Sequence, residues 1–160
     1  MKPILALVVL VVAGAVAAGV AFAARGDHGR GGEHGQHGKV IHVIEHATTD
    51  AVTNHADGAA DSVGDVLTFT NDVFDQGNAQ KVGSDQGYCV RLVVGASWEC
   101  VWTTFLPRGQ LTVEGPFYDT KDSVLAITGG TGKYANARGS MELKSRAGGT
   151  EFDFIFHLIG

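Results

Sequence analysis

Residues 87–106 read GYCVRLVVGASWECVWTTFL, two runs rich in β-branched and aromatic residues on either side of a Val94-Gly95 pair. Such runs favour strands, and a two-residue turn at Val94-Gly95 predicts an antiparallel hairpin. The register that follows pairs six residues across the hairpin: Cys89 with Cys100, Arg91 with Trp98, and Val90 with Glu99. In an oxidising compartment the facing cysteines, Cys89 and Cys100, predict a disulfide, with two free thiols as the alternative.

A second hairpin is expected to turn at Arg108-Gly109, which sets Trp102 opposite Gly115 and Thr104 opposite Val113. Because side chains alternate along a strand, the two registers together define two faces of the sheet. One face carries both tryptophans and both cysteines: Cys89, Trp98, Cys100, Trp102, Val113, Gly115 and Phe117. The opposite face carries Glu99, Thr103, Thr112 and Glu114. The first face is therefore predicted to point inward, unless a subunit interface reverses the argument.

Short apolar runs separated by Gly, Asn and Asp continue along the rest of the chain and predict an all-β fold. Strands are expected near 39–47, 65–73, 79–83, 87–94, 98–106, 110–117, 123–128, 138–145 and 150–158. Residues 48–64 are polar and small and are expected to form a long loop, with a helical turn as an option. The domain from Lys39 to Gly160 is long enough for a single core or an eight-stranded barrel, and we expect a small antiparallel barrel.

The chain begins with features of an export signal. Met1-Lys2 gives a short positive start, residues 3–24 carry no charge, and Ala21-Phe22-Ala23 has the small-x-small form of a cleavage site. We expect a signal peptide over residues 1–23 and a secreted or extracytoplasmic domain. The alternative is an uncleaved membrane anchor, because some 20 apolar residues are long enough to span a bilayer.

Residues 24–38 are rich in Gly and charge, lack aliphatic side chains beyond Ala24, and are expected to form a flexible tether. The tether holds three histidines, His28, His34 and His37, which lie on no helix or strand and predict only weak, non-specific metal binding. No specific metal site is expected anywhere in the chain.

Composition and motifs argue against several function classes. The formal net charge of −5 provides no basic stripe for nucleic acid. Residues 129–133, GGTGK, lack the first glycine and the final Ser or Thr of a phosphate loop, so a turn is expected there. Ser84 lacks the flanking glycine of a nucleophile elbow, and no histidine pair has the spacing of a zinc helix. A serine or metal hydrolase is therefore not expected.

Several segments occur in a fixed order that is similar to a known family. They are GDVLTFTN at 64–71, VG at 82–83 with GYCV at 87–90, LTVEGPF at 111–117, and AITGGTG at 126–132. Over about residues 40–160 the chain resembles the allene oxide cyclases and the related dirigent proteins. The resemblance implies an eight-stranded barrel, often a homotrimer, that needs no cofactor and folds an apolar substrate in one way while it cyclises or couples.

The resemblance therefore implies a cofactor-free cyclase or isomerase that acts on a hydrophobic small molecule inside the barrel, and the N-terminal signal predicts that it is exported. The alternative is a non-catalytic carrier or dirigent-like guide that only holds such a ligand. Fold alone does not choose between them, since sites are grafted onto scaffolds.

Three residues match the family's site. The resemblance gives Glu45 the electrostatic role beside the reacting group, gives Asn71 the role of holding a water, and makes Cys89 part of the cavity wall. The alternatives are a solvent-exposed strand carboxylate for Glu45 and a turn-forming side chain for Asn71. Ala47 and Phe117 replace a second Asn and a Tyr of the plant pattern, so the plant substrate is not expected.

Inward alternation and aromatic character point to a set of ligand-binding candidates: Phe69, Cys89, Arg91, Trp98, Trp102 and Phe117. Such aromatic residues also form cores and subunit interfaces, which is the alternative. Arg91 is expected to stack on the indole of Trp98 and to offer its charge to an acidic ligand, or else to lie in water at the barrel rim.

Overall fold

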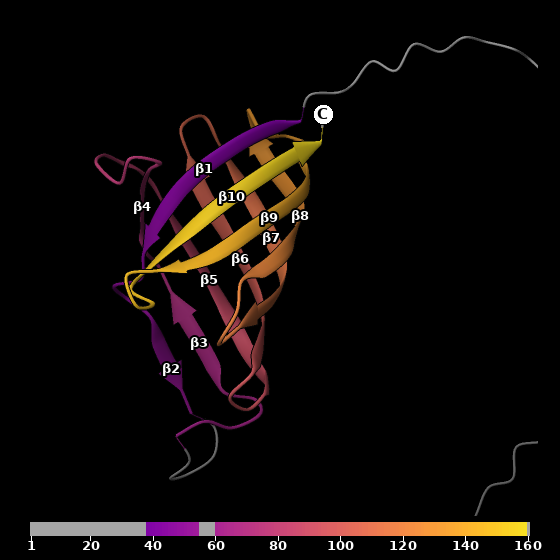
Figure 1. Cartoon of the computed structure of the whole chain (residues 1–160). Helices are drawn as coiled ribbons and strands as arrows, with labels where there is room; N and C mark the ends of the chain where they lie inside the picture. Colours follow the sequence, from indigo (N-terminus) through magenta and orange to yellow (C-terminus); the bar gives the residue numbers. More distant parts are fainter. Residues whose placement is uncertain (1–37, 55–59, 160) are drawn as a thin grey trace, which may run out of the picture. The chain divides into compact units, whose positions relative to one another are not determined.

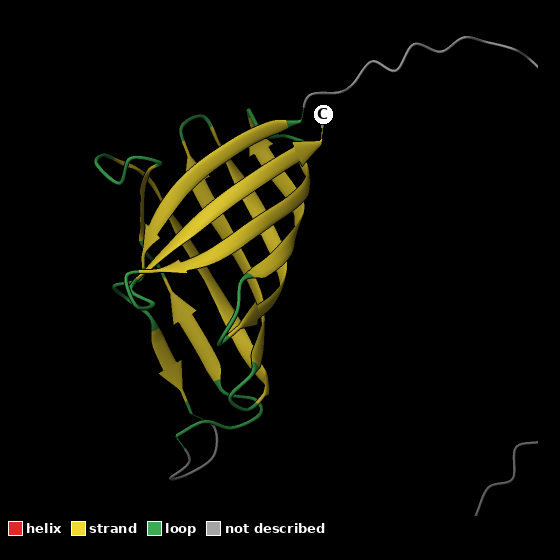
Figure 2. Ribbon diagram, in the orientation of Figure 1, coloured by secondary structure: helices red, strands yellow, loops and turns green. Residues whose placement is uncertain are grey.

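The computed structural model describes residues 38–54 and 60–159, and within these ranges the chain is all-β with no helix (Figure 2). The described residues accordingly contain no helix of the length and apolarity needed to cross a membrane. The predicted signal segment at 1–23 and nearly all of the predicted tether at 24–38 lie outside the described residues.

The described residues form ten strands in one antiparallel sheet (Figure 1). They are β1 Lys39–His46, β2 Ala51–Thr53, β3 Val66–Phe69, β4 Asp72–Asp75, β5 Lys81–Val93, β6 Ser97–Leu106, β7 Gly109–Tyr118, β8 Ser123–Gly132, β9 Arg138–Arg146 and β10 Glu151–Ile159. Neighbouring strands follow the order β2-β3-β5-β4-β1-β10-β9-β8-β7-β6, and a further pairing of β5 with β6 closes the sheet into a barrel.

Two of the eight positions around the barrel are occupied by interrupted strands. β1 pairs with β4, and β2, which follows β1 after a break at residues 47–50, pairs with β3. β3 and β4 both pair with β5, on either side of a break at residues 70–71. Counting β1 with β2 and β3 with β4 as one position each gives the closed eight-stranded antiparallel barrel that the sequence predicts.

Three expected boundaries were wrong. The predicted loop at 48–64 contains β2, the predicted strand at 65–73 divides into β3 and β4, and the predicted strands at 79–83 and 87–94 are one strand, β5. β5 stays continuous because two glycines, Gly83 and Gly87, let its backbone approach Phe105 and Trp102 of β6 more closely than any side chain would permit.

The hairpin of β5 and β6 has the expected register, with Cys89 paired to Cys100 and Arg91 to Trp98. Cys89 and Cys100 form a disulfide. The turn differs in detail, because the ladder resumes at Val93 and Ser97 and an irregularity lies between Arg91 and Val93. The turn therefore contains three residues, 94–96, instead of the expected two. The irregularity compensates for the extra residue, and so the pairing at the cysteines is unchanged.

The expected register of the next hairpin was wrong by two residues. The turn lies at Pro107-Arg108, and Trp102 pairs with Val113 rather than Gly115, as Thr104 pairs with Leu111 rather than Val113. Proline suits the first central position of a turn, and Arg108 adopts the positive φ of 74° at the second. A shift of two residues leaves each side chain on its predicted face.

The predicted inward face of this region forms much of the barrel core. Five of its seven residues are buried: Cys89, Trp98, Cys100, Trp102 and Val113. They pack in one cluster with side chains from the other strands, among them Val43, Leu111, Leu125, Ile127, Met141, Leu143, Phe154 and Phe156. The side chains assigned to the opposite face, Glu99, Thr103, Thr112 and Glu114, are exposed or half-buried.

We predict that a Cys89→Ala/Cys100→Ala double variant loses about 2–3 kcal/mol of unfolding free energy, because the disulfide closes a short loop in the unfolded chain. The cysteines are separated by 11 residues. Urea unfolding followed by tryptophan fluorescence measures this difference. Wild-type protein in reductant is the control and should approach the variant's stability, whereas a variant as stable as the oxidised wild type would contradict the prediction.

Candidate functional site

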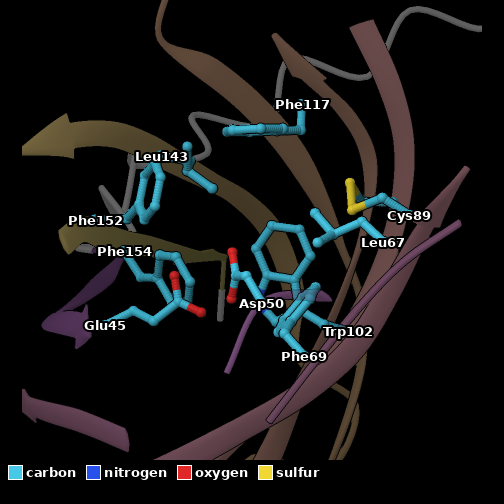
Figure 3. A pocket seen from close by; sticks show the side chains of 11 residues that line it. Glu45, Asp50, Leu67, Phe69, Cys89, Trp102, Phe117, Leu143, Phe152 and Phe154 are labelled. Atoms are coloured by element: carbon cyan, nitrogen blue, oxygen red, sulfur yellow. A yellow bond between two sulfur atoms is a disulfide. The ribbon is translucent and has the colours of Figure 1, made fainter. Parts of the chain in front are cut away.

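A narrow cavity of about 40 Å³ lies inside the barrel (Figure 3). Eleven residues line it: Glu45, Asp50, Leu67, Phe69, Cys89, Cys100, Trp102, Phe117, Leu143, Phe152 and Phe154. Nine of these side chains are apolar or disulfide-bonded, so the two carboxyl groups are the polar exceptions in its wall. An apolar pocket with a few convergent polar groups is the usual form of a small-molecule site.

Aromatic rings from four strands form most of the wall. The ring of Trp102 lies 5.4 Å from that of Phe154 and 6.1 Å from that of Phe69, measured between centroids. Phe117 and Phe152 meet edge to face at 5.9 Å. These separations fall within the range of favourable aromatic pairs, which fixes the shape of the wall.

The disulfide supplies another part of the wall. Cys89 and Cys100 are both buried and both line the cavity. Because their sulfurs are bonded to each other, neither offers a thiolate, and their contribution to the cavity is to its shape.

Asn71 lies directly behind Glu45, at the break between β3 and β4. Its side-chain amide donates hydrogen bonds to Glu45 Oε1 and Asp50 Oδ1, each at 2.8 Å. Its carbonyl oxygen accepts from the backbone N–H groups of Thr48 and Thr49 at 3.0 Å and from the Thr49 hydroxyl at 2.9 Å. Asn71 therefore holds both carboxyl groups of the cavity while it satisfies the backbone at the break between β1 and β2.

A third carboxyl group, that of Asp85 on β5, is fully buried beside this network. Its Oδ1 accepts a hydrogen bond from the Asn71 N–H at 3.1 Å, and its Oδ2 has no hydrogen-bond partner among the described residues. Burial raises the pKa of Asp85 to about 7, although contact with the Glu45 carboxyl and the Asn71 N–H offsets part of the rise.

Burial raises the pKa of Glu45 well above its ordinary value, and the negative charge of Asp85 adds to this rise. The hydrogen bond from Asn71 lowers the pKa and offsets part of the rise. Only 5% of Glu45 is exposed. Two acids that share one buried region do not readily ionise together, so at neutral pH the pair retains a proton. The arrangement provides a neutral carboxylic acid at the wall of an apolar cavity, able to donate a hydrogen bond or a proton.

Five of the predicted site residues meet at the cavity: Glu45, Phe69, Cys89, Trp102 and Phe117. Asn71 does not line the cavity and is joined to it through Glu45. Its side chain bonds residues of the preceding strand break rather than its own backbone, and Glu45 is buried rather than solvent-exposed.

Arg91 and Trp98 lie apart from the cavity lining and form a separate cluster. The guanidinium carbon of Arg91 lies 3.9 Å from the centre of the Trp98 ring, as the register predicts. Arg91 also forms ion pairs of 2.7 Å with Asp61 and with Asp119. Because two carboxylates already neutralise it, Arg91 ties the loops that carry them to the barrel instead of presenting a free charge to a ligand.

Asp85 was missed at the sequence level because residues 84–86 were assigned to a gap between two strands. With β5 continuous, alternation back from Cys89 through Gly87 places Asp85 on the inward face, so a longer strand would have identified it. Asp50 was missed because it lies in the predicted loop, and its approach to Asn71 depends on the break after β1.

Comparison with known proteins agrees with this geometry. The family model described as allene oxide cyclase matches residues 36–160. The chain belongs to the allene oxide cyclase family. The resemblance drawn from the sequence segments is thereby confirmed.

Solved structures share the barrel. A pyocyanin demethylase is 25% identical, with a TM-score of 0.66 over 75% of this chain and 99% of its own. A pterocarpan synthase dirigent protein is 18% identical, with a TM-score of 0.59 over 77% and 97%. The Diels–Alderase AbmU from Streptomyces koyangensis is 14% identical, with a TM-score of 0.59 over 79% and 71%. The fold thus hosts several small-molecule activities, and the choice among them depends on the site.

We predict that the unfolding free energy falls as pH rises from about 4 to 7, because native Asp85, with a pKa of about 7, holds a proton that the unfolded chain releases near 3.8. The Asp85 proton alone should contribute about 1.4 kcal/mol per pH unit to the slope, and Glu45, whose pKa is also raised, adds to it. Urea unfolding across this pH range measures it. Asp85→Asn should make the slope shallower by the contribution of that proton, and Asp122→Asn, at an exposed position, should leave it unchanged. Equal slopes in wild type and Asp85→Asn would show that Asp85 is not protonated in the native state.

Proposed function

We propose that the barrel binds an apolar small molecule and that Glu45, as a neutral carboxylic acid, promotes its cyclisation or isomerisation. One observation carries the proposal: an almost fully buried carboxyl group lines a cavity whose wall is mostly apolar. Burying an acid in this way costs stability, and such groups concentrate at functional sites.

The chemistry follows from the environment of Glu45. A neutral acid in a region with little water is a strong hydrogen-bond donor, and its proton is directed at an oxygen of the bound molecule, such as an epoxide or carbonyl oxygen. The donor stabilises negative charge that develops on that oxygen while a carbon–oxygen or carbon–carbon bond rearranges. Return of the proton to Glu45 completes an isomerisation, so the product has the mass of the substrate.

Asn71 and Asp85 are assigned supporting roles in this scheme. The amide of Asn71 fixes the orientation of Glu45 through its 2.8 Å hydrogen bond. Burial and, next, the negative charge of Asp85 where that group is ionised keep the proton on Glu45 at neutral pH. The aromatic wall would hold one folded conformer of the substrate, which lowers the entropic part of the barrier.

The dimensions of the site indicate how a ligand would enter. A cavity of about 40 Å³ accepts only part of a typical metabolite. Three of its lining residues, Phe117, Leu143 and Phe152, also line a larger outer depression of about 440 Å³ beside residues 118–122. A ligand would therefore place its reactive group between the rings and leave its remainder in the outer depression, with Phe117 and Phe152 at the constriction.

The related structures support a small-molecule partner without specifying it. They include a demethylase, a dirigent protein and Diels–Alderases, so both enzymatic and guiding roles occur on this barrel. The apolar segment at residues 3–24 supports export, which would place the ligand outside the cytoplasmic membrane.

We predict that native mass spectrometry of the protein purified from its host, or incubated with a host extract, detects a retained apolar compound. On incubation with fresh protein this compound should convert to a product of identical mass and different chromatographic retention. Glu45→Gln should still retain the compound but convert it at least 100-fold more slowly, because the amide keeps the shape and loses the acidic proton.

Glu142→Gln is the matched control, since Glu142 lies on the barrel exterior, paired with Lys144 and His157, and its substitution should leave conversion unchanged. Conversion at wild-type rate by Glu45→Gln would remove Glu45 from the mechanism. Retention of a compound that wild type and variant both release unchanged would favour the carrier function instead.

A further inference from the structure

The basic side chains of the barrel are unevenly distributed. Among the described residues, five lysines and arginines form no ion pair with any described carboxylate. One of them, Lys121, lies in the β7–β8 connection, and the other four are grouped at one end: Lys39, Arg108, Lys133 and Arg138. All four are exposed. They come from the start of β1, the β6–β7 turn, the segment after β8 and the start of β9. Strand pairing brings these four segments to the same end of the barrel. We call these four residues the basic end.

Tyr134 holds two of these cations close together. The ammonium groups of Lys39 and Lys133 lie 5.6 Å and 5.8 Å from the centre of its buried ring. The ammonium group of Lys39, with a further contribution from Arg108, lowers the pKa of Lys133. Like charges gathered in this way repel one another, and an anion placed between them would relieve the repulsion.

A surface depression of about 340 Å³ lies between these groups. It is lined by Lys39, Lys133, Tyr134, Ala135, Asn136, Ala137, Leu158 and Ile159. Aliphatic side chains form part of its lining, and one of them, Ile159, is 67% accessible. Cations around a depression with exposed aliphatic groups at its edge match the interfacial region of a bilayer, where phosphate lies above acyl chains.

The chain itself leads from this end toward an apolar segment. β1 begins at Lys39, beside the last residues of β10 (Figure 1). Upstream of it, fourteen residues at 25–38 separate the barrel from the uncharged run at 3–24, which is long enough to span a bilayer if it is retained. Because β1 begins at Lys39, the chain that follows this run enters the barrel at the basic end.

We propose that the basic end docks on the phosphate headgroups of an anionic lipid bilayer. The net charge of the whole chain is −5, so an anionic surface repels the barrel in most orientations and attracts it at this end. The GGTGK segment at 129–133 thus contributes to phosphate binding through the Lys133 side chain at a turn, and not as a phosphate loop. This proposal does not depend on the catalytic role of Glu45.

The test places a reporter at the basic end of the full-length chain. Ile159→Trp introduces an exposed indole there, whereas Trp98 and Trp102 are buried in the core. Brominated acyl chains in phosphatidylcholine vesicles, with or without about 30 mol % phosphatidylglycerol, quench an indole that contacts the bilayer. Because the reporter is on the barrel, insertion of residues 3–24 alone does not produce the signal.

The expected result is quenching on the anionic vesicles that diminishes with added salt. In the same background, Lys39→Glu/Lys133→Glu should weaken it at least tenfold, since each lysine near an anionic surface contributes about fivefold. Lys121→Glu/Lys144→Glu makes the same charge change away from the basic end and should leave quenching within about twofold. Thermal unfolding of each variant confirms that the barrel is intact.

Equal quenching in the two double variants would overturn the proposal, as would quenching that does not depend on phosphatidylglycerol. Titration with inorganic phosphate, followed by NMR of the lysine side chains, separates the two sources of phosphate. Saturable binding of inorganic phosphate without quenching on vesicles would assign the site to a free anion and would show that lipid docking is wrong.

Discussion

The side chain of Asn71 is the contact on which the inner site depends. The barrel has breaks at residues 47–50 and 70–71, where the ladder stops and backbone groups need partners outside it. The Asn71 carbonyl oxygen accepts from Thr48 and Thr49 in one break, while its own backbone lies in the other and pairs with Asp85. The same amide orients the Glu45 carboxyl through its N–H group. The requirement to satisfy a broken strand and the requirement to hold a buried acid are therefore met by one residue, which explains why the acid is located at the break.

The position of Glu45 has an energetic consequence for the rest of the barrel. Glu45 and Asp85 are buried as a pair, and the ordinary way for a protein to reduce that cost is to keep one of them protonated. The apolar surroundings raise this cost and also strengthen any hydrogen bond that the acid makes to a ligand. The disulfide and the aromatic cluster stabilise the β5–β6 region next to this pair, and so they offset a site that by itself destabilises the fold.

Local regularity decides which of these features could be predicted from the sequence. The pairing of Cys89 with Cys100 depends on one turn and on strict alternation, so it was predicted correctly. The inward orientation of Trp102 was also predicted correctly despite the register error, because a two-residue shift preserves the face. The closed barrel was also predicted correctly, because the segments that resemble the family are short contiguous stretches of sequence. Asp85 was missed because two glycines resemble a strand boundary in sequence while in space they permit close packing. The bonds of Asn71 to the β1–β2 break could not be read either, since they join residues more than twenty positions apart.

The two ends of the barrel differ in charge and in what they contain, and this difference constrains how it works. The cavity opens toward Phe117 and Phe152, at the end of β7 and the start of β10, where Asp119 and Asp122 line the outer depression. The basic end lies at the start of β1 and the end of β10, and is therefore the opposite end. A barrel held on a membrane by its basic end would present the cavity mouth to the aqueous side. Its ligand would then arrive from water or from another protein and would not enter directly from the bilayer. The constriction between Phe117 and Phe152, rather than a lipid-facing portal, would therefore select which molecules reach Glu45.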